Sequence, residues 1–172
     1  MEEVPFVKES IAVDAACSGN PGEMEYRGVD LQTGKEIFHQ HFEIWTNNVG
    51  EFLAIVHGLA WLTPLRKGDS ETEWSGGFSK REPNPLYPDK IPPTPLYERG
   101  QRKALYSDSK IAMNWVKQGQ CKSLLRKKEP DLELRRIVEK AELRLKDHGI
   151  PFQLLKWKTE DRGEIPADFG RK

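Results

Sequence analysis

The first 45 residues carry the patterns of β-strands. Residues 10–16 form a short β-prone run that ends at a turn signal, Ser-Gly-Asn-Pro-Gly over residues 18–22. Residues 25–32 and 35–45 flank Thr33-Gly34, and the second of these runs alternates between apolar and polar side chains. We therefore expect a strand followed by two further strands in antiparallel order.

The pattern then becomes mainly helical. After residues 46–48, apolar side chains recur at helical spacing as far as Leu62. Asn47 or Asn48 is placed to cap the start of this helix, and Pro64 follows its end. Later apolar spacing predicts helices over residues 109–118 and 131–147 and short strands over residues 104–107 and 152–158.

The order of these elements predicts the fold class. Three strands, a helix, a strand, two helices and a strand indicate an α/β protein with a five-stranded mixed sheet, its first three strands antiparallel, flanked by helices. Residues 66–103 are rich in proline and have no sustained periodicity, which is typical of a surface insertion. We expect residues 1–172 to form one domain that carries this insertion.

Composition narrows the class of protein. No apolar run approaches the length that crosses a bilayer, and the N-terminus has no secretion signal, so we expect a cytoplasmic protein without membrane contact. Cys17 and Cys121 lie far apart and lack the spacing of a zinc site, which favours two free thiols. The 27 basic and 27 acidic residues cancel, so any contact with a polyanion has to come from local clusters.

Four acids stand at the ends of predicted elements, and they are the candidate chemistry. Asp14 ends a strand, Glu51 opens a helix, Asp108 ends another strand, and Asp168 follows the last one. Taken singly, such acids are more often helix caps or solvated side chains. Taken together, clustered carboxylates repel one another unless a cation is bound, and hard cations such as Mg²⁺ prefer carboxylate oxygens.

The residues around these acids resemble ribonuclease H type 1, segment by segment and in the same order. Val13-Asp14 precedes a Gly-Asn-Pro-Gly turn at residues 19–22, and a Thr-Asn-Asn segment at residues 46–48 precedes Glu51. Further along, Tyr106-Ser107-Asp108-Ser109-Lys110 is similar to the family's second aspartate motif, and Ala167-Asp168 to its last. The matching segments span most of the chain outside the insertion.

The resemblance implies a ribonuclease H-like fold and an endonuclease that hydrolyses the RNA strand of RNA/DNA hybrids, leaving 5′-phosphate and 3′-hydroxyl ends. It implies two Mg²⁺ ions, with Mn²⁺ as a substitute, because a metal pair can activate water and stabilise the leaving oxygen. In these roles Asp14 bridges both metals, and Glu51 and Asp108 hold the metal near the leaving group. Asp168 helps to hold the metal that activates water.

The resemblance also implies residues that contact the hybrid and recognise the 2′-hydroxyl of its RNA strand. These substrate-binding candidates are Ser18, Gly19, Asn20, Asn47, Asn48, Ser109 and Lys110. A basic run around the middle helices lies where the family contacts DNA phosphates: Lys110, Lys117, Lys122, Arg126, Lys127 and Lys128. Their simpler interpretations are turn residues, a helix cap and a solvated face.

Three departures from the family pattern leave alternatives open. The loop before Asp168 has no histidine, so Glu160 or Glu164 would have to substitute. The chain stops four residues after Asp168, which predicts a mobile tail, and the basic handle is shortened to residues 119–130. We expect a monomeric enzyme; the alternatives are a catalytically weak hybrid-binding module and a different nuclease or strand-transfer enzyme on the same fold.

Overall fold

The computed structural model describes residues 6–63, 104–123 and 132–170, and within them five strands form one mixed sheet in the order β3-β2-β1-β4-β5. Strands β1 (Ser10–Gly19), β2 (Gly22–Asp30) and β3 (Glu36–Trp45) are antiparallel neighbours. Strands β4 (Ala104–Ser107) and β5 (Gln153–Lys156) extend the sheet in parallel with β1. The expected sheet is confirmed; the predicted insertion at residues 66–103 lies outside the described residues.

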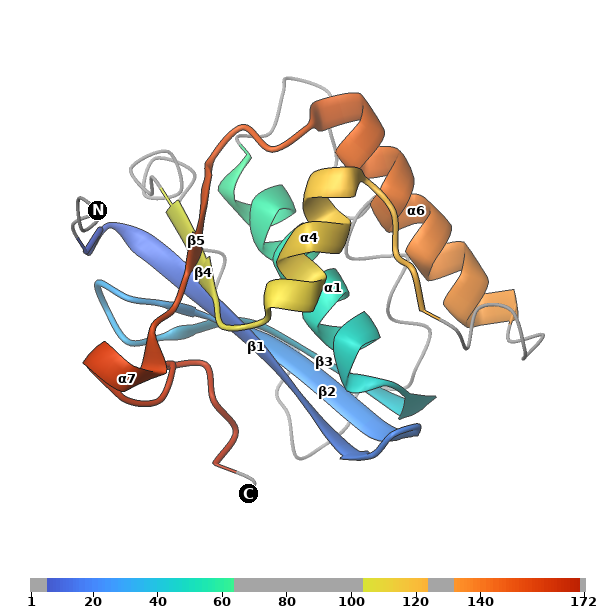
Figure 1. Cartoon of the computed structure of the whole chain (residues 1–172), viewed down its shortest axis with the longest axis horizontal. Coiled ribbons are helices and arrows are strands. Elements are labelled where there is room, and N and C mark those ends of the chain that lie inside the picture. The colour runs from blue at the N-terminus through green and yellow to red at the C-terminus, as the bar shows by residue number, and fades with distance from the viewer. Residues whose placement is uncertain (1–5, 64–103, 124–131, 171–172) are drawn as a thin grey trace.

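Helices cover the sheet unequally (Figure 1). Helix α1 (Asn47–Leu62) lies against the sheet, and α4 (Lys110–Gln118) and α6 (Leu132–His148) pack on α1. The short α7 (Thr159–Arg162) and the chain after it lie on the opposite side of the sheet. None of the helices in the described ranges is long and apolar enough to cross a membrane.

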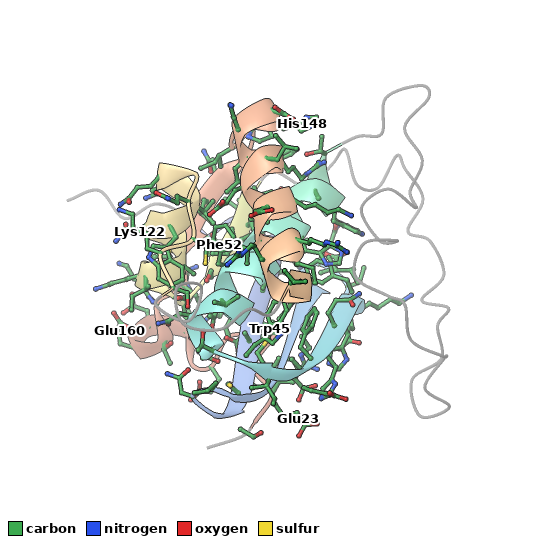
Figure 2. All side chains as sticks on the ribbon, turned by 90° about the vertical axis from the view of Figure 1, so that its right-hand side faces the viewer. Glu23, Trp45, Phe52, Lys122, His148 and Glu160 are labelled. Carbon is green, nitrogen blue, oxygen red and sulfur yellow. The ribbon has the colours of Figure 1, made fainter. Side chains whose placement is uncertain are left out.

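Each face of the sheet has its own core. The larger cluster joins α1 to β1, β2 and β4, and it includes Phe52, which is fully buried and lies among the helices in Figure 2. The smaller cluster, on the other face, contains Ala12, Tyr106, Trp157 and Ala167. The smaller core therefore attaches the segment that leads to Asp168 to the middle of the sheet.

Two local predictions were wrong. Residues 18–22 were expected to form a loop, but β1 continues to Gly19, which pairs with Gly22, so the turn is shorter. A side chain at residue 22 would come 2.2 Å from the Ser18 main-chain oxygen, so only glycine allows this tight hairpin. At the start of α1, Thr46 is the N-cap, without a side-chain bond, and Asn47 is already helical.

Close packing of α1 on the sheet depends on Gly58. A Cβ at this position would lie 2.4 Å from Leu105 Cδ1 and 3.1 Å from Ile11 Cδ1, both fully buried. We expect Gly58→Ala to destabilise the protein by about 1–2 kcal/mol, because overpacking outweighs the gain of up to about 1 kcal/mol in helix propensity. The shift in the urea unfolding midpoint measures this loss of stability. Ala60→Ser, at a half-buried position of the same helix, should change stability by less than about 0.5 kcal/mol.

Candidate active site

The sheet register brings Asp14 and Asp108 to the same level. β1 and β4 are parallel neighbours, and Ala12 of β1 pairs with Tyr106 of β4. Both acids stand two residues further along their chains, so the end of β4 delivers Asp108 beside Asp14. Parallel pairing between segments about ninety residues apart in sequence therefore creates the first half of the site.

Helix α1 supplies Glu51 as its fifth residue, just after its first turn. The preceding residue is Gly50, where a Cβ would lie 2.6 Å from Met24 Sδ and 3.0 Å from Ala15 Cβ. The missing side chain lets the start of the helix lie directly on β1 and β2. This close packing places Glu51 next to Asp14; a larger side chain at residue 50 would push the start of the helix away from the sheet.

The three carboxylates converge tightly. One oxygen from each of Asp14, Glu51 and Asp108 lies within 4.8 Å of the other two. Asp14 and Glu51 are 6% and 4% exposed, whereas Asp108 is half-buried. The cluster is therefore open to solvent on the Asp108 side, where a substrate would have to approach.

Burial and mutual repulsion dominate the electrostatics of the cluster. Burial, with help from the charges of Asp108 and Asp168, raises the pKa of Asp14 from 3.8 to about 7. Burial and the charges of Asp14 and Asp108 raise the pKa of Glu51 well above its usual value. The pKa of Asp108 is also raised by burial, although Lys156 opposes the shift. Without a cation, ionising all three carboxylates at neutral pH is unfavourable, because they are close together and two of them are buried.

The residues fit a divalent cation. Glu51 Oε2 is buried and has no hydrogen-bond partner among the described residues, so it is a polar atom that still needs a ligand. Clustered carboxylate oxygens are the ligands that Mg²⁺ and Mn²⁺ prefer. The same cation would relieve the repulsion that raises the three pKa values.

Asp168 lies near this cluster but outside the group that meets at ligand distance. Its charge raises the pKa values of both Asp14 and Asp108, so it is close to both of them. Its own side chain is half-buried, and its Oδ2 accepts a hydrogen bond from the Gly170 amide at 2.9 Å. The structure therefore brings three of the four acids together and leaves the fourth beside them.

The substrate-binding candidates lie at three places: the start of α4, the start of α1 and the tip of the β1–β2 hairpin. Ser109 directly follows Asp108, and its hydroxyl caps α4 by accepting a hydrogen bond from the Ala112 amide at 3.2 Å. Asn47 and Asn48 begin α1, four and three residues before Glu51. Three further candidates, Ser18, Gly19 and Asn20, are exposed at the tip of the β1–β2 hairpin, and Lys110 is exposed at the start of α4.

The structure describes only part of the basic run that the sequence predicted, and the described residues of the run are exposed. Lys117 and Lys122 are solvent-exposed, on α4 and just after it. Residues 126–128 lie outside the described ranges. The DNA-phosphate role of this run stays a prediction.

Sequence reasoning missed one charged residue near the acids. Lys156 ends β5, pairs in register with Ser107, and donates a hydrogen bond from Nζ to the Asp108 main-chain oxygen. Glu164, one of the two residues named from the sequence in place of the absent histidine, is close enough for its charge to raise the pKa of Asp108. A parallel β4–β5 pairing, had it been assigned from the sequence, would have pointed to Lys156.

Comparison with known proteins returned no matching family model. Among solved structures, the chain is similar to LC11-RNase H1, isolated from compost by a metagenomic approach, at 18% identity and a TM-score of 0.43 over 88% of this chain and 84% of that one. The same protein in complex with an RNA/DNA hybrid gives 17% identity, a TM-score of 0.42 and coverage of 90% and 88%.

A third solved structure, RNase H1 of the halophilic archaeon Halobacterium salinarum, matches at 16% identity and a TM-score of 0.41 over 92% of this chain and 91% of that one. All three neighbours are ribonuclease H1 structures, and each match covers most of both chains. Since the identities and TM-scores are low, what this chain does has to follow from its own sheet and its own acids.

Proposed function

We propose that this protein is a ribonuclease H, an endonuclease that hydrolyses the RNA strand of RNA/DNA hybrids with divalent metal ions. The observation that carries the proposal is the convergence of Asp14, Glu51 and Asp108, from two strands and a helix, within 4.8 Å. These are three of the acids whose flanking sequences resemble ribonuclease H type 1. A fortuitous cluster would not be expected to choose the same three residues.

The reaction sets clear demands on the site. A water oxygen has to form a bond to phosphorus while the bond from phosphorus to the 3′ oxygen breaks, which leaves a 5′-phosphate and a 3′-hydroxyl. Bound Mg²⁺ or Mn²⁺ ions would supply the acidity that activates the water and the charge that stabilises the departing oxygen. The acids of this chain would hold those ions and so fix where the scissile phosphate sits.

We assign the holding roles from the resemblance to ribonuclease H type 1. Asp14 is buried, and one of its oxygens lies within 4.8 Å of an oxygen of each of the other two acids; in the resemblance it is the carboxylate that would be shared between two ions. Glu51 and Asp108 flank it and would hold the ion near the leaving group. Asp168, beside the cluster, would help to hold the ion near the attacking water.

Selection of the hybrid would fall to polar groups close to the acids. Asn47, Asn48 and Ser109 all lie within four residues of a clustered acid, and each offers a polar side chain at a helix start. Such groups can hydrogen-bond a 2′-hydroxyl, which is the feature that distinguishes RNA from DNA. The capping bond of Ser109 still leaves its hydroxyl able to donate.

The test is cleavage of a labelled RNA strand. We expect the wild-type protein with Mg²⁺ or Mn²⁺ to cut RNA in a hybrid into products with 5′-phosphate ends. It should leave duplex DNA and duplex RNA of the same sequence intact, and EDTA should abolish cutting. Binding of the hybrid without cutting in either metal would instead support the binding-module alternative, and cutting of duplex DNA would support a different nuclease.

A further inference from the structure

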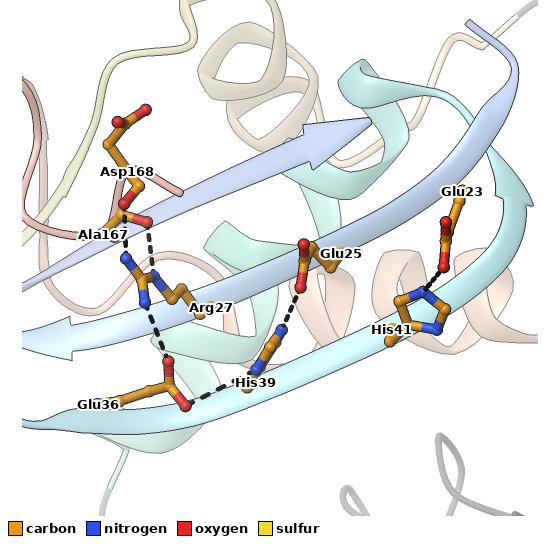
Figure 3. Close-up of polar contacts among 8 residues, drawn as sticks. All are labelled: Glu23, Glu25, Arg27, Glu36, His39, His41, Ala167 and Asp168. Carbon is orange, nitrogen blue, oxygen red and sulfur yellow. Dashed lines mark hydrogen bonds and ion pairs between the residues drawn. The ribbon is translucent and has the colours of Figure 1, made fainter. Parts of the chain in front are cut away.

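One arginine ties the end of the chain to the sheet. Arg27 in β2 donates from Nε to the Ala167 main-chain oxygen at 2.8 Å and from Nη2 to the Asp168 main-chain oxygen at 2.5 Å. The partners lie 140 and 141 residues away in sequence. Figure 3 shows both bonds running from one guanidinium group to two consecutive carbonyls.

The guanidinium group is itself held from two further sides. Its Nη1 lies 3.3 Å from Glu36 Oε2, and its Cζ lies 4.6 Å from the ring centroid of Phe169. The ring of His39 lies 5.6 Å from that of Phe169, and His39 Nδ1 lies 3.8 Å from Glu36 Oε1. Because these contacts hold the guanidinium group in place, its hydrogen bonds can fix the positions of the Ala167 and Asp168 carbonyl oxygens.

The register of the sheet puts this arginine beside the acid cluster. Arg27 is the cross-strand partner of Asp14, and directly opposed residues of antiparallel strands project to the same face. The carbonyls of the 167–168 segment are thus held one strand away from Asp14. The Asp168 carboxylate points away from the guanidinium in Figure 3, which leaves it available at the cluster.

Apolar packing holds the same segment, but it does not set the direction of the acid. Ile165 and Ala167 are buried in the smaller core, and Trp157 Nε1 donates to the Gly163 oxygen at 2.9 Å. These contacts keep the segment on the sheet. Asp168 follows Ala167, the last buried residue in the described part of the chain, so hydrogen bonds orient its main chain: those from Arg27 and that of its own amide to the Ile165 oxygen.

We propose that Arg27 is the positioning residue for Asp168, holding the fourth acid toward Asp14 and Asp108 through its main chain. The inference rests on the proposed function for its catalytic consequence, since Asp168 matters to cleavage only if it helps to hold metal. The anchoring itself does not depend on that function. The two parts are therefore tested by separate measurements.

The catalytic part is tested with Arg27→Met, which keeps length but removes every donor, and Arg27→Lys, which keeps charge but not the two-nitrogen fork. We expect Arg27→Met to lower kcat for hybrid cleavage by about 10- to 100-fold, as for residues that orient metal ligands, while KM for hybrid changes by less than about threefold. Arg27→Lys should fall between Arg27→Met and wild type. Raising the Mn²⁺ concentration should partly restore Arg27→Met. Arg136→Met, at an exposed position of α6, should match wild type.

A double-variant comparison separates positioning from general damage. If Arg27 acts through Asp168, then Arg27→Met should slow an Asp168→Asn enzyme by less than about twofold, because the group that it positions is already lost. Equal slowing in the wild-type and Asp168→Asn backgrounds would overturn the proposal. Wild-type kcat in Arg27→Met would overturn it as well.

The anchoring part is tested by amide hydrogen exchange. The Asp168 amide donates to the Ile165 oxygen at 2.8 Å, and the Gly170 amide to Asp168 Oδ2. Exchange over residues 165–170 should accelerate at least about tenfold in Arg27→Met and stay unchanged in Arg136→Met. Unchanged exchange in Arg27→Met would overturn the anchor whatever the activity. If wild type does not cut hybrid, the proposed function and the catalytic part fail, while accelerated exchange would still uphold the anchor.

Discussion

Replacing Asp108 with asparagine should lower the rate of hybrid cleavage by about 10³-fold or more, since bound metal contributes several kcal/mol and each 1.4 kcal/mol is a factor of ten. Asparagine keeps the size of the side chain but removes the charge that holds a cation. Asp108 is half-buried beside Asp14 and Glu51, so the loss of one charge also relieves their repulsion. Folding should therefore be preserved or slightly improved. Single-turnover cleavage of a labelled hybrid measures the effect.

The matched control for this variant is Asp147→Asn, the same chemical change at an exposed position of α6. It should cut hybrid at the wild-type rate. Thermal unfolding of all three proteins in EDTA would show that Asp108→Asn is folded. Activity of a folded Asp108→Asn within tenfold of wild type would refute the metal-holding role of this acid.

The sequence predicted the elements of the sheet well because their signals are local. Alternation in residues 35–45 and helical spacing up to Leu62 each depend on a single face of one element. The observed β3 and α1 match those predictions within two residues. The β1–β2 hairpin was predicted less well, because the glycines that signal a turn also permit the strands to pair almost to its tip.

The candidate site was predicted from the sequence through its motifs and not through its geometry. No local pattern reveals that Gly50 allows α1 to lie on β1, because that requires knowing that Met24 and Ala15 face the helix. The contact between Arg27 and the Ala167 carbonyl could not be predicted from the sequence for a related reason. It joins residues 140 positions apart, and an arginine in a predicted strand is usually an exposed side chain.

The segment that carries Asp168 shows how such long-range contacts change a prediction from sequence. Asp168 was expected to lie in a mobile tail. In the structure Ile165 and Ala167 are buried, and Arg27 binds the carbonyls of residues 167 and 168. Tertiary contacts therefore hold this segment on the sheet.

In metal-free solution, the acid cluster should make the protein less stable as the pH rises. The pKa of Asp14 is about 7 in the folded protein and 3.8 when unfolded, so the folded state binds the extra proton between these values. Stability from this group is fully present below about pH 4 and is lost as the pH rises through about 7. Over that window of about three pH units the loss amounts to roughly 4 kcal/mol, at about 1.4 kcal/mol per pH unit.

A comparison of wild type with Asp14→Asn removes this contribution, together with the effect of the Asp14 charge on the pKa of Glu51. In EDTA, we expect the variant to be more stable than wild type by about 4 kcal/mol at pH 8, with the difference shrinking toward zero by pH 4. Mg²⁺ or Mn²⁺ should stabilise wild type at pH 8 and have much less effect on the variant, because a bound cation offsets the repulsion. Urea unfolding at several pH values measures both effects, with Asp147→Asn at an exposed position of α6 as the control for the chemical change. A stability difference between Asp14→Asn and wild type that stays constant from pH 4 to pH 8 would mean that Asp14 is not held in a buried, repulsive cluster.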